Sequence, residues 1–195
     1  PAIVGDNLYI LAGRDGSDLL LCIDVATGKE LWASEPLGKM FSNDWGDGPR
    51  STPTVDGEHT YVMTSEGNVV CLKTADGSVV WTKAMQDLGG KIPQWGYCES
   101  PLVMDGKVYC TPGGEQGAMA ALDKATGEPI WQSKGLADPA HYSSIMPTDR
   151  GGRTILVQLL MKEFVGVDPA DGRAIWTLPF PGNVAVIPTP IVSGD

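Results

Sequence analysis

One short motif occurs four times along the chain, and this repeat limits the fold more than any other feature. Each copy has a glycine followed four residues later by a tryptophan, and successive tryptophans are 49, 50 and 45 residues apart. Self-similarity at a period of roughly 20 to 50 residues is typical of propellers and solenoids. The pairs are Gly28 and Trp32, Gly77 and Trp81, Gly127 and Trp131, and Gly172 and Trp176.

The segments between the motifs are short, rich in β-branched and aromatic residues, and separated by glycine turns. In the second repeat we predict strands at 51–55, 60–64, 68–73 and 78–83. In the first repeat, the run Leu19–Ile23 is apolar without alternation, which predicts a strand buried on both faces. A solenoid of hairpins is the competing architecture, but four strands in 45 to 50 residues is the size of a propeller blade.

The sequence therefore predicts an all-β fold, a β-propeller of four-stranded antiparallel blades. We expect one partial propeller domain over residues 1–195, with a single extra first strand at 187–192. The chain opens without an initiator Met or signal segment, so we interpret it as trimmed or as cut from a longer protein. The four blades are expected at roughly 1–34, 51–84, 99–134 and 143–178.

Three of the repeats place an aspartate four residues before the motif glycine. Asp24, Asp123 and Asp168 can accept backbone N–H bonds across the turn from the third to the fourth strand, which the glycine closes with a positive φ. Lys73 takes this position in the second repeat, so we expect that turn to be the loosest. The tryptophan lies on the fourth strand and is large enough to cover the gap to the next blade. We interpret the motif glycines and tryptophans as structural.

Composition excludes several function classes. The formal net charge of −10 argues against nucleic acid or an anionic lipid surface as partner, and no run of 18 apolar residues is present to insert into a membrane. The four cysteines form no Cys-x-x-Cys pair and only two histidines accompany them, so we assign no zinc or other metal site. We expect four free thiols, at Cys22, Cys71, Cys98 and Cys110.

The pattern Asp-x-x-Thr-Gly-x-x-x-Trp, seen at 24–32 and 123–131, resembles the tryptophan-docking repeat of the pyrroloquinoline-quinone (PQQ) type propellers. The stretches 45–53 and 95–101 look similar to those of the PQQ-like repeat proteins of planctomycete-type bacteria. The resemblance implies a ring of eight blades, of which this chain would supply half. It also implies a periplasmic or extracytoplasmic bacterial location. The superfamily contains both quinoprotein alcohol dehydrogenases and non-catalytic outer-membrane assembly proteins.

The resemblance alone does not show whether the chain binds PQQ and calcium, which depends on particular residues. The dehydrogenases use a vicinal Cys-Cys disulfide, a calcium ion held by Glu and Asn, and an aspartate base. This chain has no Cys-Cys pair, and Asp44, Asp47 and Glu99 match no such calcium site. We therefore assign no catalytic, cofactor-binding or metal-binding residue, and PQQ and calcium belong only to the alternative that the chain is a dehydrogenase fragment.

Blade topology predicts where a binding site would lie. The first-to-second and third-to-fourth strand turns share one face, and their tight Asp-Gly turns leave little room there. The other face carries the long loops 41–50, 94–99 and 140–144, with exposed aromatic and charged residues that suit a recognition surface. The candidates are Asp44, Trp45, Asp47, Arg50, Trp95, Tyr97, Glu99, His141 and Tyr142.

The sequence and the resemblance leave three functions open. The first is a non-catalytic scaffold that recognises a protein or polymer through the loop-rich face, and the second is a fragment of a quinoprotein alcohol or polyvinyl-alcohol dehydrogenase-like enzyme. The third is a carbohydrate- or polymer-binding module in which Trp45 and Trp95 are stacking surfaces. In the competing structural interpretation these two tryptophans only plug the mouth of a central channel. The chain could also self-associate to complete a ring.

Overall fold

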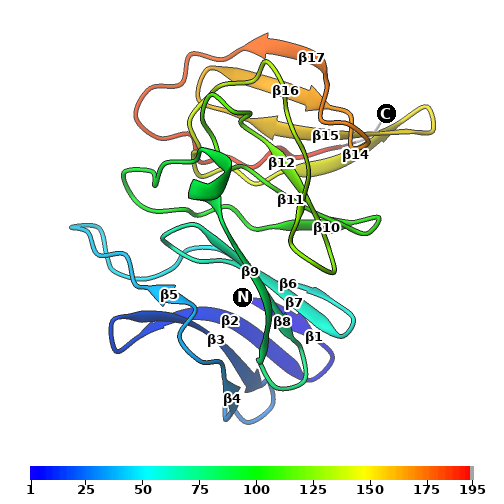
Figure 1. Ribbon diagram of the computed structural model, residues 1–195. Helices are drawn as coiled ribbons and strands as arrows, with labels where there is room; N and C mark the ends of the chain where they lie inside the picture. The colour runs from blue at the N-terminus through cyan, green and yellow to red at the C-terminus, as the bar shows by residue number, and fades with distance from the viewer. Residues whose placement is uncertain (194–195) are drawn as a thin grey trace. The chain divides into compact units, whose positions relative to one another are not determined.

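The computed structural model describes residues 1–193, so Gly194 and Asp195 of the predicted domain lie outside the described residues. The chain folds into four antiparallel sheets, each made of four consecutive strands in sequence order (Figure 1). Helix is limited to one 3-10 turn within the described residues, η1 (Met85–Leu88). The predicted all-β fold of four-stranded antiparallel blades is confirmed.

The chain divides into two compact units, and the first comprises residues 1–84 and 94–101. It holds two sheets, with one additional short strand that pairs with β3. Leu19, Leu20, Leu21 and Cys22 of β3 are buried in succession, as predicted for a strand covered on both faces. The strands are β1 (Ala2–Val4), β2 (Asn7–Arg14), β3 (Ser17–Asp24), β4 (Glu30–Ala33) and β5 (Gly38–Lys39), then β6 (Thr54–Asp56), β7 (His59–Met63), β8 (Asn68–Lys73) and β9 (Val79–Ala84).

The second unit comprises residues 85–93 and the chain from residue 102 onward. Its two sheets enclose a core to which both contribute, including Tyr109, Met119, Trp131, Leu156 and Val165. The strands are β10 (Leu102–Met104), β11 (Lys107–Cys110), β12 (Ala120–Asp123) and β13 (Pro129–Gln132), then β14 (Met146–Arg150), β15 (Arg153–Leu159), β16 (Glu163–Val167) and β17 (Ala174–Pro179).

The turns from third to fourth strand are closed by carboxylates, as the repeat predicted. Asp24 Oδ1 accepts hydrogen bonds from the N–H and the hydroxyl of Thr27, at 2.7 and 2.6 Å, and Asp123 Oδ1 accepts the N–H of Thr126 at 2.9 Å. The hydroxyl and N–H donors of Thr27 lower the pKa of Asp24 below its usual value. Each of these turns is therefore closed by an ionised aspartate that belongs to the turn itself.

The turn that contains Lys73 is closed in a different way. Gly77 N–H donates to Lys73 O at 2.9 Å, as in the other turns, while Asp76 Oδ1 accepts the N–H and hydroxyl of Ser78 at 2.9 and 2.6 Å. Asp76 therefore supplies the cap that Lys73 cannot. The expected loosening is not seen in the hydrogen bonds of this turn.

Two of the repeated tryptophans, Trp32 and Trp131, contact the turn of the following sheet within their own unit. In the second unit, Trp131 on β13 is buried, its indole N–H donates to Pro169 O at 3.1 Å, and its ring packs so closely on Gly172 that a Cβ there would overlap it. In the first unit, the Trp32 ring packs on Gly77 in the same manner. The side chains of Trp32, Trp81 and Trp176 are half-buried.

Residues 187–192, predicted to add a strand, form none in the structure. This segment is nevertheless held at one point, because Ser144 N–H donates to Thr189 Oγ1 at 3.1 Å. In the first unit, Thr52 N–H donates to Ser100 Oγ at 3.0 Å. Ser100 and Thr189 are equivalent positions of the repeat, so each accepts the same kind of hydrogen bond from the preceding repeat. Pro188 and Pro190 lack the N–H groups that pairing needs, and no second strand lies beside the segment in the described chain.

All four cysteines are free thiols, as expected, and Cys22, Cys71 and Cys110 are buried. Burial raises the pKa of the half-buried Cys98 to about 11, so its thiol stays protonated at neutral pH. Among residues 1–193 no helix has the length and hydropathy to cross a membrane.

Candidate recognition surface

The recognition loop, residues 41–50, follows β5 and projects away from the strands (Figure 1). Asn43 organises its tip: Oδ1 of Asn43 accepts Trp45 N–H at 2.9 Å, and Nδ2 donates to Gly46 O at 3.1 Å. Asp47 Oδ1 accepts Asn43 N–H at 3.2 Å. A side-chain bond from an asparagine to the backbone N–H two residues ahead forms an Asx turn. Gly46 directly follows this turn and takes a positive φ of 116°.

Arg50 clamps this loop to the second loop, residues 94–99. Its guanidinium donates to Gly46 O at 2.6 Å and to Gly48 O and Trp95 O, both at 3.2 Å. Its donors are therefore directed to loop carbonyls of this same unit, which makes Arg50 a structural part of the surface.

Trp45 stands at the tip of the recognition loop with 82% of its surface exposed. Its own backbone is fixed by the Asn43 bond, while the indole ring reaches into solvent. The acidic neighbours Asp44 and Asp47 are exposed beside it, and Trp95 on the second loop is half-buried. An exposed aromatic side chain on a fixed backbone is suited to anchor a partner.

Two predicted surface residues are instead buried. Tyr97 and Glu99 are each 1% exposed, so the structure does not place them on a surface open to a ligand. Tyr97 lies beneath the β7–β8 turn, where its ring packs on Gly67 and its N–H donates to Ser65 O at 2.9 Å. The second loop has no regular secondary structure, so the sequence alone does not show which of its side chains turn inward.

His141 and Tyr142 belong to the second unit. Both are half-buried, with ring centroids 5.4 Å apart, and both contact Val186 through hydrogen bonds. His141 Nδ1 accepts Val186 N–H at 3.3 Å, and burial lowers the pKa of His141 below its usual value. His141 is therefore a hydrogen-bond acceptor that fixes the backbone of Val186.

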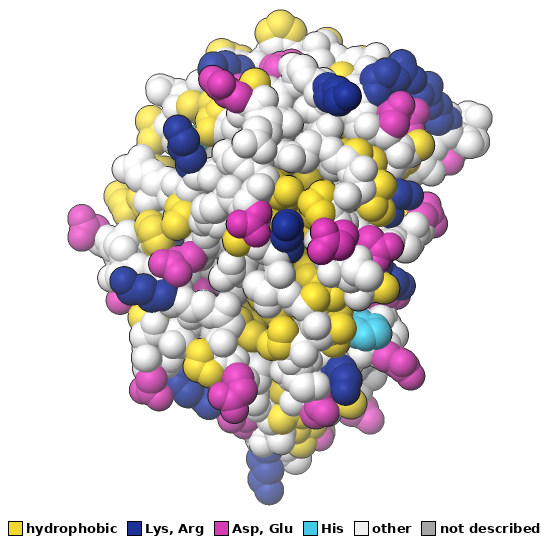
Figure 2. Space-filling view, in the orientation of Figure 1, with side chains coloured by type: hydrophobic (Ala, Val, Ile, Leu, Met, Phe, Trp, Pro, Cys, Tyr) yellow, Lys and Arg dark blue, Asp and Glu magenta, His cyan; other side chains and the backbone are white. Residues whose placement is uncertain are grey.

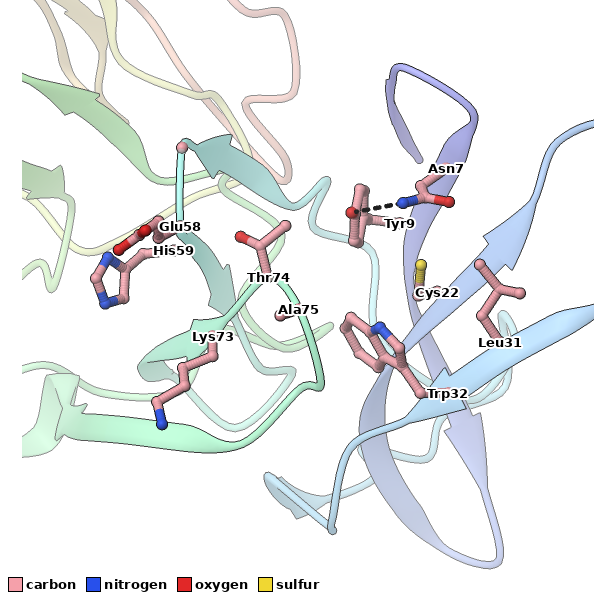
Figure 3. Close-up of a pocket in the computed structure, with 11 residues that line it drawn as sticks. Asn7, Tyr9, Cys22, Leu31, Trp32, Glu58, His59, Lys73, Thr74 and Ala75 are labelled. Atoms are coloured by element: carbon pink, nitrogen blue, oxygen red, sulfur yellow. Dashed lines mark hydrogen bonds between the residues drawn. The ribbon is translucent and has the colours of Figure 1, made fainter.

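A cleft of about 680 Å³ opens between the two sheets of the first unit, on the face with the tight turns (Figure 3). Tyr9, Cys22 and Trp32 of the first sheet line one side, and the turn at Thr74 and Ala75 lines the other. The expectation that this face has little room is therefore wrong for the first unit.

The cleft differs from the equivalent junction in the second unit by two hydrogen bonds. Among the described residues, Trp32 Nε1 has no acceptor, and the Tyr9 hydroxyl accepts from Asn7 Nδ2 at 3.3 Å. In the second unit, by contrast, Trp131 Nε1 and the Tyr109 hydroxyl both donate to Pro169 O. Three of the four tryptophans have a tyrosine partner, which lies three residues after the turn between the first and second strands of the same sheet. The ring centroids of these pairs are 5.9 to 6.1 Å apart. This repeated pair was not predicted from the sequence.

Charge is dispersed over the face of the molecule seen in Figure 2. Figure 2 shows acidic and basic side chains interspersed on the visible face, with hydrophobic side chains exposed between them. Within the described part of the chain, no group of three or more His, Cys, Asp and Glu side chains could hold a metal ion.

Comparison with known proteins places the chain in a family. A family model described as outer membrane protein assembly factor BamB matches residues 16–186. The chain is 27% identical over 198 residues to outer membrane protein assembly factor BamB of Burkholderia pseudomallei (strain K96243), covering 97% of this chain and 48% of that protein. It is also 27% identical over 119 residues to quinohemoprotein alcohol dehydrogenase ADH IIB of Pseudomonas putida, covering 58% of this chain and 17% of that one.

Among solved structures, the quinohemoprotein alcohol dehydrogenase from Comamonas testosteroni matches with a TM-score of 0.65 and 18% identity, over 91% of this chain and 34% of that one. At this identity the likeness shows the fold alone. Four antiparallel four-stranded blades with the repeated turn and tryptophan define a β-propeller of the PQQ-type repeat class. Within that class, the chain belongs to the family of the outer membrane protein assembly factor BamB. It spans about half the length of the BamB relative that it matches.

Proposed function

We propose that this chain is a non-catalytic propeller segment that recognises a partner protein through the recognition loop, with Trp45 as the anchor. The observation that carries the proposal is an indole 82% exposed on a loop whose backbone is held by Asn43 and Arg50. A loop that is already ordered loses little entropy on binding, and tryptophan is enriched among the residues that dominate binding energy.

The acidic surroundings of Trp45 restrict the partner. Asp44 and Asp47 lie beside it in sequence, both exposed, and the chain carries a formal net charge of −10. A complementary surface would therefore be an apolar pocket for the indole with basic or neutral side chains at its rim. The family relatives are named as assembly factors for outer membrane proteins, which supports a protein partner and an extracytoplasmic bacterial location.

A polymer ligand is the variant of this proposal that Trp45 also permits, because an exposed indole can stack on a sugar ring. The two are separated by retardation of the chain in gels that contain soluble glycans. Retardation that Trp45→Ala abolishes would favour the polymer over the protein partner.

The dehydrogenase alternative draws on the Pseudomonas relative, but the residues present do not fit the cofactor. The four cysteines form no disulfide and three of them are buried, and the part of the chain that the structure describes has no carboxylate cluster for calcium. Binding of PQQ in the presence of calcium at micromolar strength, about −8 kcal/mol, would overturn the non-catalytic proposal.

The proposal is tested by photo-crosslinking in the full-length protein. A photoreactive phenylalanine analogue replaces Trp45 in one variant and Val79, an exposed apolar residue of β9, in the control. We expect an adduct of one defined partner at position 45 and not at 79, and weakening of that partner's binding by Trp45→Ala of about 2 kcal/mol or more. Equal adducts at both positions, or no effect of Trp45→Ala, would contradict it.

A further inference from the structure

Ser65, in the turn between β7 and β8, joins the first sheet to both loops of the recognition surface. Its N–H and hydroxyl both donate to Asp18 Oδ2, at 2.7 and 2.6 Å. Its Oγ accepts Phe41 N–H at 3.0 Å, and its carbonyl accepts Tyr97 N–H at 2.9 Å. The backbone and side chain of this one residue therefore fix the start of the recognition loop, the second loop and β3 to one another.

Asp18 is the acceptor on which this arrangement rests. It lies near the start of β3, is fully buried, and its Oδ1 has no hydrogen-bond partner among the described residues. A buried carboxylate with one unpaired oxygen is unfavourable, so a core selected for stability alone would carry an apolar residue here. The backbone of Asp18 also contributes, since its carbonyl accepts Leu37 N–H at 2.8 Å and it pairs with Gly38 of β5.

The contacts continue from this pair to the tip of the recognition loop. Phe41, held by Ser65, accepts Gly48 N–H on its carbonyl at 3.0 Å and so closes the base of the loop. On the second loop, a Cβ at Gly96 would lie 2.9 Å from Ser65 O, so the two backbones are in direct contact. Arg50 then links Gly46 to Trp95 across the two loops.

We propose that the Asp18–Ser65 pair positions the recognition surface. The pair attaches the base of the recognition loop to the first sheet, and this loop carries Trp45 at its tip. The role of this pair in recognition rests on the proposed function, whereas its effect on the order of the loop can be measured without any partner. Both residues act through the loops and touch no ligand themselves.

Amide hydrogen exchange on the full chain tests the proposal. Ser65→Ala removes the hydroxyl that Phe41 and Asp18 share, so we expect the amides of residues 41–48 and Tyr97 to exchange about tenfold faster, the factor expected from the loss of one or two net hydrogen bonds. The matched control is Ser34→Ala, which removes another buried serine hydroxyl of the first unit. Ser34 Oγ accepts Leu20 N–H at 3.0 Å and donates to Glu35 O at 2.8 Å, so the hydrogen bonds of its hydroxyl lie outside both loops.

Asp18→Asn is the second variant, because it keeps an oxygen acceptor for Ser65 while removing the charge. We expect a smaller gain in loop exchange than in Ser65→Ala, and a double variant that exchanges no faster than Ser65→Ala, because both changes act on one interaction. The proposal is overturned if Ser65→Ala accelerates loop exchange no more than Ser34→Ala, or if the two changes add independently. If Ser65→Ala accelerates loop exchange as expected while Trp45→Ala leaves partner binding unchanged, the proposed function alone is rejected.

Discussion

Asp18 and Asp24 are carboxylates of the same strand whose ionisation should affect stability in opposite directions. Burial raises the pKa of Asp18, with the hydrogen bonds from Ser65 opposing the shift, whereas the Thr27 hydroxyl and N–H lower the pKa of Asp24. When folding raises the pKa of a carboxyl group, as at Asp18, the resulting contribution to stability is complete below the ordinary pKa near 3.8 and is lost as pH rises through the raised pKa. When folding lowers the pKa, as at Asp24, the contribution is present above the ordinary pKa and is lost as pH falls through the lowered pKa.

We therefore expect Asp18→Asn to become more stable relative to wild type as pH rises from about 4 toward 7. Asp24→Asn should become less stable relative to wild type as pH rises through the region below about 4, where wild-type Asp24 ionises. The measurement is the free energy of unfolding in urea at a series of pH values. Parallel pH profiles for the two variants would show that burial does not dominate at Asp18.

Single residues also mark where sequence reasoning stops. The exposure of Trp45 follows from a loop rich in Asn, Asp and Gly, and the free thiols follow from cysteine spacing. The burial of Tyr97 and Glu99 and the structural use of Arg50 depend on contacts between loops about 45 residues apart, which local patterns do not encode. Asp18 did leave a signal, since a lone carboxylate directly precedes the apolar run Leu19–Ile23.

At the scale of elements, the sheets and their turns were predictable because glycine and strand alternation are local properties. The short strand β5 and the absence of a strand at 187–192 were not, because pairing depends on what lies beside a segment. The cleft beside Trp32 was not predicted for a related reason. Trp32 lacks the hydrogen bond that Trp131 makes to the next sheet, and the position of Trp32 in the sequence repeat does not reveal this difference.

The contact of Trp131 with Gly172 gives a prediction about how neighbouring sheets are joined. Gly172 and Gly28 have nearly equal φ values, 75° and 69°, but only at Gly172 would a Cβ meet a neighbouring ring. Gly28→Ala should cost about 1 kcal/mol through the left-handed backbone alone. Gly172→Ala should cost a further 1–3 kcal/mol or so because the added methyl displaces Trp131. Thermal melting of both variants measures the difference, and equal losses would exclude ring docking as a stabilising contact.

At the scale of the whole molecule, the fourth sheet leaves apolar surface unfilled. Two hollows, of about 360 and 370 Å³, are lined by this sheet and by residues 188–193. Phe164 lines both hollows, Leu178 lines the first and Trp176 lines the second. Leu178 is 57% and Ile191 91% exposed. Exposed apolar surface of this kind costs about 25 cal/mol per Å², and large patches mark sites where another surface binds.

We expect the 195-residue chain to self-associate through this surface. Sedimentation velocity over a range of concentrations should show a rising weight-average coefficient, and Leu178→Asp should reduce it because the charge would be desolvated in the contact. Ile92→Asp, at an exposed apolar residue outside the patch, is the control and should leave association unchanged. Association that Leu178→Asp does not weaken would place the contact elsewhere. A chain that stays monomeric at every concentration would show that the C-terminal segment covers the fourth sheet well enough by itself.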